Sequence, residues 1–339
     1  MKRNSMLRTG GTLCALALGL SPIVRPAYAA NENPQEQAAH ANWRAIMKHV
    51  PTPDTGCFHA SYPSVVWESV DCTIGSPHAP TRVKPTDGTP EVVGNGNDWV
   101  AQTPGLISEA IGTFSISGVE SEKSVGVIEY GGHGILGPNE YSVQLNTNPN
   151  QTTSACAGHS GCKVWQQFVY ATDYISSGKA AVFMQYWLLN WGSSPCPSGW
   201  NSYFSDCYVN SPLTPAKDIP ITDLGQVELT AYVQAGKSDS VTLYYGSDVW
   251  SRTSPDAQLE IASVWNQAEF NVLGDSGGSR AEFNSGSSIN VTLGFLATSP
   301  VTCLAGAGST GETNNLKLGS CTASVGYYGI PFIQFSESN

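Results

Sequence analysis

The sequence predicts an all-β protein, an antiparallel sandwich of two sheets of the jelly-roll type that begins with one short helix. Charged residues make up only 13% of the 339-residue chain, and Gly, Ser, Thr, Asn, Val and Tyr are abundant, as in β proteins with many short strands and turns. Short stretches in which apolar and polar residues alternate recur from residue 94 onward. Such alternation indicates strands that bury one face.

The first 29 residues have the features of a signal peptide. A positively charged start precedes a short apolar run at residues 13–20, and Ala27-Tyr28-Ala29 offers small residues at a cleavage site. The apolar run is too short to span a bilayer. We therefore expect a secreted mature chain that begins at Ala30, lies in an extracellular or periplasmic compartment and does not bind a membrane.

The net charge limits the possible partners. Loss of residues 1–29 removes four basic residues and no acidic one, so the formal charge falls from −11 to −15. Nucleic-acid binding needs a basic surface, so the sequence excludes it. A negative charge of this size favours solubility without identifying a substrate. We expect a monomer with no cofactor and no metal.

The cysteines predict disulfides. Cys14 leaves with the signal peptide, and the eight that remain are an even number, as expected in an oxidising compartment. Eight cysteines allow 105 connectivities, and we predict pairing between sequence neighbours. A zinc site at Cys156 and Cys162 is the alternative, but it lacks a second close pair and matching histidines. The predicted disulfides are Cys57–Cys72, Cys156–Cys162, Cys196–Cys207 and Cys303–Cys321.

Residues 30–93 are predicted to form a helix and a disulfide loop ahead of a β-sandwich domain, residues 94–339. Trp43 and Met47 recur at helical spacing within residues 33–49, and the prolines that follow end the helix. The segment is either a subdomain packed on the sandwich or a removable pro-segment, because secreted hydrolases are often masked.

Alternation places the strands in order along the chain. Residues 265–293 are predicted to be a hairpin, since two alternating runs flank the Gly- and Ser-rich turn 274–278. In the first run, Glu269 and Asn271 lie on the face opposite Phe270. Calcium binding by this turn, through Asp275, is an alternative to ordinary turn chemistry. The other predicted strands are 107–119, 124–130, 140–148, 163–171, 180–191, 226–235, 240–245 and 330–335.

Histidine, cysteine and metal chemistry find little support in the sequence. The six histidines all lie in the first half, His133 being the best placed, and no G-x-S-x-G or H-E-x-x-H motif occurs. Polar residues on predicted strands remain, chiefly Gln144, Gln185 and Glu269. A carboxylate in a sheet groove can act as a general base on water, and an amide can stabilise an oxyanion. The alternative is that each is a partly buried polar residue satisfied by its neighbours.

Three of these stretches resemble the glutamic peptidases of the eqolisin family, which are secreted enzymes with a jelly-roll (concanavalin-like) sandwich. Residues 143–148 (VQLNTN) are similar to the family's L-Q-T-G-V-D strand, and residues 268–275 (AEFNVLGD) to its A-E-W-I-V-E-D strand. Residues 185–188 (QYWL) resemble its W-Y-E-W strand. The glutamate of W-Y-E-W and the second glutamate of A-E-W-I-V-E-D have no counterpart here. Neprosin-type peptidases, which use two glutamates, are the neighbouring family.

The resemblance implies a secreted acid-type endopeptidase that acts on a protein or peptide substrate. Glu269 would be the general base that activates water, and the amide of Gln144 would stabilise the oxyanion. A non-catalytic secreted β-sandwich module that binds glycans through its aromatic residues is the alternative function. The residues expected to contact the substrate are Gln185, Tyr186, Trp187, Trp191 and Asn271.

Overall fold

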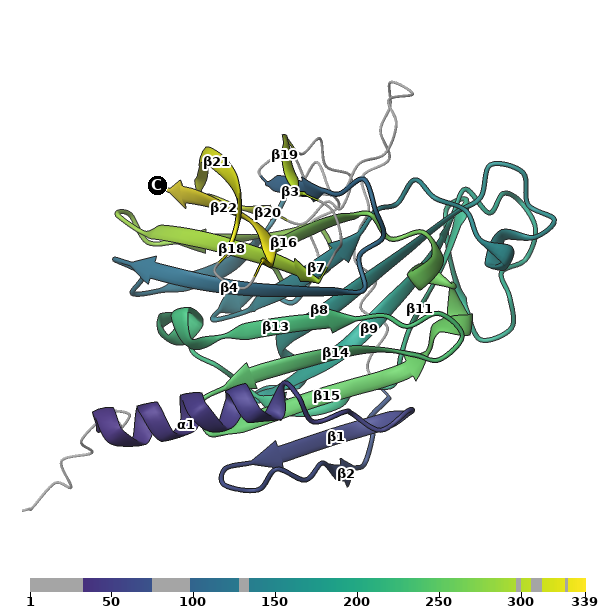
Figure 1. Cartoon of the computed structure of the whole chain (residues 1–339). Helices are drawn as coiled ribbons and strands as arrows, with labels where there is room; N and C mark the ends of the chain where they lie inside the picture. The colour runs from purple at the N-terminus through teal and green to yellow at the C-terminus, as the bar shows by residue number, and fades with distance from the viewer. Residues whose placement is uncertain (1–32, 75–97, 128–133, 297–299, 306–312, 327–328) are drawn as a thin grey trace, which may run out of the picture.

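The computed structural model of the chain describes residues 33–74, 98–127, 134–296, 300–305, 313–326 and 329–339. It confirms the predicted fold class, because two large antiparallel sheets and a short N-terminal helix form a β-sandwich (Figure 1). The predicted signal peptide and His133 lie outside the described residues.

The first large sheet joins segments that lie far apart in the sequence. Two strands of the segment predicted to precede the sandwich, β1 and β2, form one edge of this sheet (Figure 1). Within the described residues, the strand order is β2 (Glu68–Val70), β1 (Gly56–Ser61), β15 (Asp248–Pro255), β14 (Ser238–Tyr245), β13 (Glu228–Tyr232), β4 (Glu109–Ser117), β18 (Ser288–Leu296), β22 (Pro331–Ser338) and β21 (Lys317–Val325).

The second large sheet contains the strands that carry the predicted site residues. Its longest strands, β8 and β9, form a hairpin at its centre, and β12 pairs with β9 beside the main path. In the described part of the chain, the order is β10 (Asn201–Tyr203), β11 (Asp206–Asn210), β9 (Lys179–Leu189), β8 (Lys163–Ser176), β7 (Tyr141–Thr147), β16 (Gln267–Gly274), β3 (Trp99–Gln102) and β19 (Thr302–Ala305), with β12 at Thr214–Lys217.

The predicted hairpin of residues 265–293 is wrong in its pairing. β16 pairs with β7 and β3, while the second run divides into two strands, β17 and β18. β18 belongs to the first large sheet, whereas β17 joins a small third sheet. Alternation predicts where a strand lies, but it does not specify the partner of that strand. The described strands of the third sheet are β20 (Thr313–Asn314), β17 (Ser279–Phe283), β5 (Glu122–Gly126) and β6 (Gly137–Pro138).

The turn after β16 carries the chain from the second sheet to the third. Ser276, Gly277 and Gly278 all have positive φ angles, of 53°, 61° and 70°, a conformation that glycine adopts without steric cost. The N–H of Ile135 donates to the carbonyl of Asp275 at 3.0 Å. A Cβ atom on Gly134 would lie 1.8 Å from the Ser276 carbonyl oxygen, so this close approach requires glycine.

Helix α1 (Pro34–Met47) begins where the sequence predicts. Asn33 caps it by accepting hydrogen bonds from the N–H groups of Gln35 and Glu36, and Pro34 occupies the first turn. Trp43 and Met47, one helical turn apart, are buried against a cluster that includes Tyr244 of β14 and Val249 of β15. The helix therefore covers part of the outer face of the first sheet (Figure 1). No helix in the described ranges is long and apolar enough to cross a membrane.

The main core lies between the two large sheets. Phe270 of β16 stacks on Phe114 of β4, with the ring centroids 4.6 Å apart. Gly112 permits this contact, since a Cβ atom there would lie 2.4 Å from the Phe270 ring. Because Phe270 points into the sandwich, its neighbours Glu269 and Asn271 point to the outer face of the second sheet.

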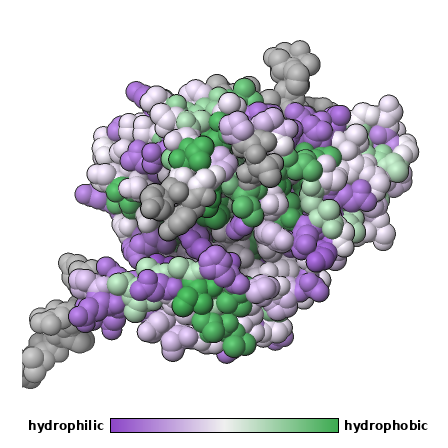
Figure 2. Space-filling model, viewed as in Figure 1, coloured by the Kyte–Doolittle hydropathy of each residue, from purple (hydrophilic) through white to green (hydrophobic). Residues whose placement is uncertain are grey.

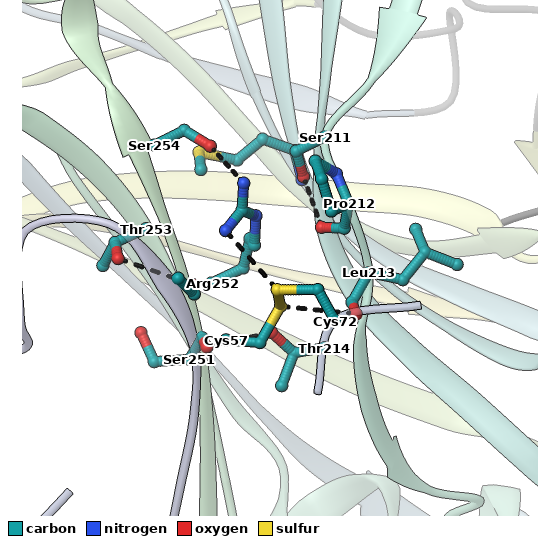
Figure 3. Close-up of a disulfide and its surroundings, with 12 residues drawn as sticks. Cys57, Cys72, Ser211, Pro212, Leu213, Thr214, Ser251, Arg252, Thr253 and Ser254 are labelled. Carbon is teal, nitrogen blue, oxygen red and sulfur yellow. Dashed lines mark hydrogen bonds between the residues drawn. A yellow bond between two sulfur atoms is a disulfide. The ribbon is translucent and has the colours of Figure 1, made fainter. Parts of the chain in front are cut away.

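The predicted disulfide pairing is confirmed. Cysteines bond to their sequence neighbours at Cα separations of 5.4–6.2 Å, so the zinc alternative for Cys156 and Cys162 is wrong. Figure 3 shows the Cys57–Cys72 bond beside Arg252 of β15 and Leu213, which precedes β12. Thr73, next to Cys72, exchanges two backbone hydrogen bonds with Leu213. This disulfide thus fastens the N-terminal segment to both large sheets, and four disulfides fit an oxidising environment.

Candidate functional site

Gln144 and Glu269 lie on neighbouring strands of the second sheet. In the antiparallel β7–β16 pair, Gln144 is opposite Asn271, and Asn146 is opposite Glu269. Directly opposite residues project from the same face of a sheet. The two residues with predicted catalytic roles therefore share the outer face, offset by two residues along the strand pair.

Asn146 connects these two side chains. Its Nδ2 donates to Oε2 of Glu269 at 3.0 Å and lies 3.4 Å from Oε1 of Gln144. The Nε2 of Gln144 donates to the hydroxyl of Ser142 at 2.9 Å. The prediction did not give Asn146 a role, although the alternation Ser142, Gln144, Asn146 along β7 marks it as facing the same way.

The hydrogen-bond network continues across two further strands. Gln167 of β8 donates from Nε2 to Oε1 of Gln144 at 2.9 Å and to Oδ1 of Asn146 at 3.1 Å. The indole N–H of Trp187 donates to Oε1 of Gln167 at 3.0 Å and to Oε1 of Gln185 at 2.8 Å. Two predicted contact residues, Gln185 and Trp187, are thereby linked to Gln144.

At the other end the network meets carboxyl groups. The Nδ2 of Asn271 donates to Oδ1 of Asp98, just before β3, and lies 3.3 Å from Oε2 of Glu337 on β22. The Asp98 carboxyl also lies near that of Glu269, which raises the pKa of Asp98. Asn314 supplies a second amide donor to Glu337, at 3.3 Å from Oε2. Neither Asp98 nor Glu337 was predicted, because both are distant from Glu269 in the sequence.

Burial raises the pKa values of these carboxyls. The pKa of Asp98 lies well above its ordinary range, first because of burial and then because of the charge and hydrogen bond of Glu269 and the charge of Glu337. Burial raises the pKa of Glu337 to about 7, although hydrogen bonds from Asn271 and Asn314 oppose the shift. The arrangement can therefore retain protons where exposed carboxyls have lost them.

The network is closed to solvent in this structure. Gln144 is 3% exposed, and Asn146, Glu269, Asn271 and Asp98 are 0% exposed. Buried polar groups are costly unless they are hydrogen-bonded, and the connected amides meet this requirement. A substrate could contact Glu269 only after a rearrangement that opens this face.

The structure does not bring all of the predicted contact residues together. Tyr186 points into the core between the sheets, on the face of β9 opposite Gln185 and Trp187. Trp191 lies beyond β9, stacked on His159 with ring centroids 3.3 Å apart. Trp187 is 0% exposed and lies against Trp165 and Tyr208. The aromatic rings proposed for glycan stacking are thus largely covered.

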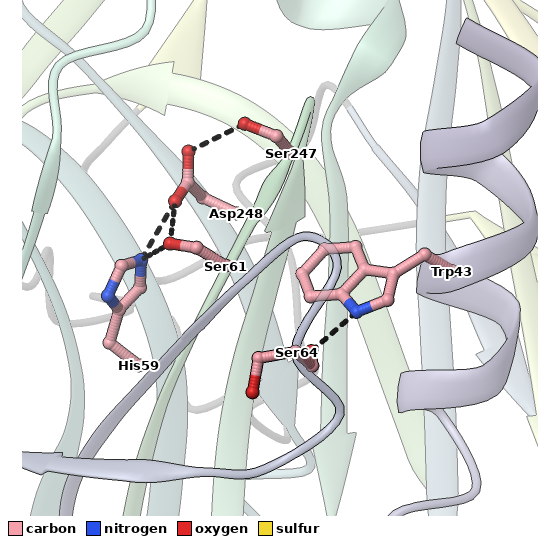
Figure 4. Close-up of polar contacts among 6 residues, drawn as sticks. All are labelled: Trp43, His59, Ser61, Ser64, Ser247 and Asp248. Carbon is pink, nitrogen blue, oxygen red and sulfur yellow. Dashed lines mark hydrogen bonds and ion pairs between the residues drawn. The ribbon is translucent and has the colours of Figure 1, made fainter. Parts of the chain in front are cut away.

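A histidine, a serine and an aspartate meet on the first sheet without forming a catalytic triad. Figure 4 shows that Asp248 and Ser61 both approach the same nitrogen of His59, Nε2, at 2.9 and 3.3 Å. Ser61 donates to Asp248 at 2.6 Å. A triad needs the serine and the aspartate on different ring nitrogens, so this group cannot relay a proton in that way.

A groove of about 430 Å³ lies elsewhere, between residues 47–54 and the outer face of the first sheet. Hydroxyl side chains of β13 and β14 line it together with the amide of Gln234, Trp67 and Tyr244. Figure 2 shows hydrophilic residues where α1 meets the sheet on this side. The groove contains none of the network residues. Among the described residues, no group of three or more His, Cys, Asp or Glu is arranged to hold a metal ion.

No protein-family model, curated protein or solved structure matches this chain. The resemblance to glutamic peptidases therefore stays a prediction that rests on three short strands. What the geometry adds is independent of that resemblance: a closed set of amides and acids on the outer face of the second sheet, joined there by Glu337 of β22 and Asn314 of β20.

Proposed function

We propose that the chain is a secreted acid-type endopeptidase that uses Glu269 and Gln144 to activate water for hydrolysis of a protein or peptide substrate. The observation that carries the proposal is their common face on neighbouring strands, with Asn146 hydrogen-bonded to Glu269. The raised pKa values of Asp98 and Glu337 in contact with the same network support an acidic working range.

In the proposed reaction, the Glu269 carboxylate takes a proton from water as the water oxygen attacks the scissile carbonyl. The side-chain amide of Gln144 donates to the oxyanion that forms. Glu269 then passes its proton to the leaving amine, so the residue ends as it began. The Asn146 amide holds one oxygen of Glu269, and water would reach this carboxylate once the face opens.

The closed face requires one further condition. The Nε2 of Gln144 donates to Ser142 at 2.9 Å, so it must turn to reach an oxyanion. We expect the purified chain to be latent until this face opens. Because the pKa values of the buried acids are raised in the closed state, protonation favours the closed face, and we expect a mild denaturant rather than acid to open it.

The test is cleavage of a denatured protein between pH 3 and pH 7, before and after incubation of the chain in dilute urea. Glu269→Gln should lower kcat/KM by at least about 100-fold, the size expected for loss of a general base. Glu68→Gln, an exposed glutamate on β2, is the matched control and should leave activity unchanged. Full activity of Glu269→Gln, or no cleavage by the wild-type chain under any of these conditions, would refute the proposal.

Secretion is part of the same proposal and has its own test. The four disulfides fit an oxidising compartment. When the full chain is expressed in a bacterium that exports proteins, the mass of the recovered product should correspond to a start at Ala30. A cytoplasmic product that retains residues 1–29 would contradict this expectation.

A further inference from the structure

Asp98 occupies the position beside Asn271 that the β3–β16 register requires. β3 pairs with β16 through Ala101 opposite Ala268. Continuing the antiparallel ladder places Asp98 opposite Asn271, on the same face as Glu269. The contacts agree, because Asn271 donates to Asp98 and the nearby Glu269 carboxylate raises the pKa of Asp98.

Ionised carboxylates only accept hydrogen bonds, so neither of two neighbouring carboxylates can donate to the other unless one carries a proton. Both Asp98 and Glu269 are 0% exposed, and Oδ2 of Asp98 meets no donor atom within the described residues. Two adjacent buried negative charges would repel strongly. One proton between the two groups removes the second charge and supplies the missing donor.

We propose that Asp98 and Glu269 hold a single proton as a carboxyl pair, and that Asp98 is a positioning residue which keeps Glu269 ready to accept a proton from water. This inference rests on the proposed function and deepens it. It supplies a second acid, which the strand containing Glu269 lacks, from a different part of the chain.

The surrounding amides are arranged for such a pair. Asn271 donates to Oδ1 of Asp98, and Asn146 donates to Oε2 of Glu269. Each carboxyl therefore has one oxygen held by a neutral amide, and the proton lies between the groups. Without an adjacent positive charge, these amides favour one negative charge on the pair over two.

Glu337 on β22 is a further charged group near this position. It acts on Asp98 through its negative charge, as Glu269 does, while β7, β16 and β20 contribute the neutral amides of Asn146, Asn271 and Asn314. A third carboxyl makes loss of the shared proton harder still. The pair therefore stays singly charged at a pH at which isolated carboxyls are fully ionised.

The protons and charge of the Asp98–Glu269 pair return to their starting values over the reaction. It begins with one proton and one negative charge, and it becomes neutral when Glu269 takes the proton from water. It returns to one negative charge when that proton passes to the leaving amine. Above the pH at which the shared proton is lost, two negative charges adjoin and the amide contacts no longer suffice. Asp98 should therefore set the alkaline limit of activity.

The first test does not depend on peptidase activity. In the mature chain carrying Glu337→Gln, infrared difference spectroscopy at pH 7 follows the C=O stretch of protonated carboxyls. Asp98→Asn and Glu269→Gln, each added to this background, should remove the same single protonated carboxyl, because either change destroys the shared site. Asp71→Asn, an exposed aspartate, should remove none. If Glu269→Gln leaves in place the protonated carboxyl that Asp98→Asn removes, the pair is overturned.

The second test uses the pH dependence of kcat/KM. Asp98→Asn keeps the side-chain size and can still donate to Glu269, and it should move the alkaline limit by about one pH unit or more. If Glu269→Gln abolishes activity but Asp98→Asn leaves the pH profile unchanged, the pair is wrong and the proposed function stands. If the infrared result holds but no chain is active, the pair stands and the peptidase proposal fails. Should Asp98→Asn not fold, titration of the wild-type carboxyls by ¹³C NMR decides, and ionisation of every carboxyl below pH 5 would refute the pair.

Discussion

Strands β7 and β18 have similar sequence patterns but different surroundings. In β7, Ser142, Gln144 and Asn146 alternate with apolar residues and face outward from the second sheet, where all three are buried. In β18, Asn290 and Thr292 alternate with apolar residues in the same way and face outward from the first sheet, where they stay in contact with solvent.

The difference shows that the same alternation serves two purposes. On the first sheet the outward polar residues of β18 stay partly or fully exposed, whereas those of β13 and β14, such as Thr230 and Thr242, are buried. On the second sheet water is excluded, so each amide must find a protein partner. Covering a polar face is costly unless every side chain on it is hydrogen-bonded. For this reason the covered face of the second sheet is a stronger candidate for a functional site than the exposed part of the first sheet.

The largest effect should come from breaking the network at its centre. Asn146→Leu removes the donor to Glu269 and the acceptor of Gln167 while keeping a similar volume. Because a buried carboxyl loses a partner, unfolding free energy should fall by about 3–5 kcal/mol. Urea denaturation measures the change.

Asn290→Leu on β18 is the matched control. Asn290 is exposed, and surface substitutions usually change stability by less than about 0.5 kcal/mol. Equal losses of unfolding free energy in the two variants would show that the outer faces of the two sheets are energetically alike, which would contradict the comparison.

The pH dependence of stability is the second expected effect. The pKa of Glu337 is raised to about 7 by burial, and the folded state therefore holds a proton that the unfolded chain has released. The stabilisation of the folded state by this proton is complete below about pH 4 and is lost as pH rises through 7. It amounts to on the order of 3 kcal/mol of unfolding free energy in total. Glu337→Gln should make the unfolding free energy flatter between pH 5 and pH 8.

Other buried acids act in the same direction and supply the baseline. The pKa of Glu122 is raised to about 9 and that of Asp239 to about 8, in both cases chiefly by burial. The pH dependence of the unfolding free energy that remains in Glu337→Gln comes from such groups. A slope identical to that of the wild-type chain would contradict the role of Glu337, and a wild-type chain that becomes more stable as pH rises from 5 to 8 would contradict all three.

The local features of this fold were predictable from the sequence, and the long-range ones were not. Asn33 and Pro34 mark the start of α1, neighbouring cysteines pair, and alternation locates β7, β9 and β16. These signals act over a few residues, or over the short loops that the disulfides close. The predicted hairpin failed because the partner of β18 is β4, more than 150 positions earlier, and nothing within residues 265–293 specifies it.

The candidate site divides in the same way. Gln144 and Glu269 could be chosen as polar residues on apolar strands, but Asp98 and Glu337 could not. They lie 173 and 66 positions from Asn271, which contacts both. Tyr186 was predicted on a resemblance and lies on the wrong side of β9, because period two sends it to the face opposite Gln185. Alternation alone would have made that distinction.

The smallest expected effect tests the first sheet. Thr230 of β13 lies opposite Thr242 of β14, and both face outward. Oγ1 of Thr230 is buried with no hydrogen-bond partner in the described structure, whereas Oγ1 of Thr242 is 2.9 Å from the Ser251 hydroxyl. Thr230→Val removes an unsatisfied group without changing shape, and it should stabilise the chain by about 1 kcal/mol.

Thr242→Val is the matched opposite, because it removes a hydroxyl that has a partner and should destabilise by about 1 kcal/mol. The two substitutions have the same chemistry on paired positions, so a shared sign in urea denaturation would contradict the argument. Opposite signs would show that polar residues on the first sheet act one by one. On the second sheet, by contrast, a single substitution such as Asn146→Leu leaves several partners unsatisfied, and this coupling is what sets its outer face apart.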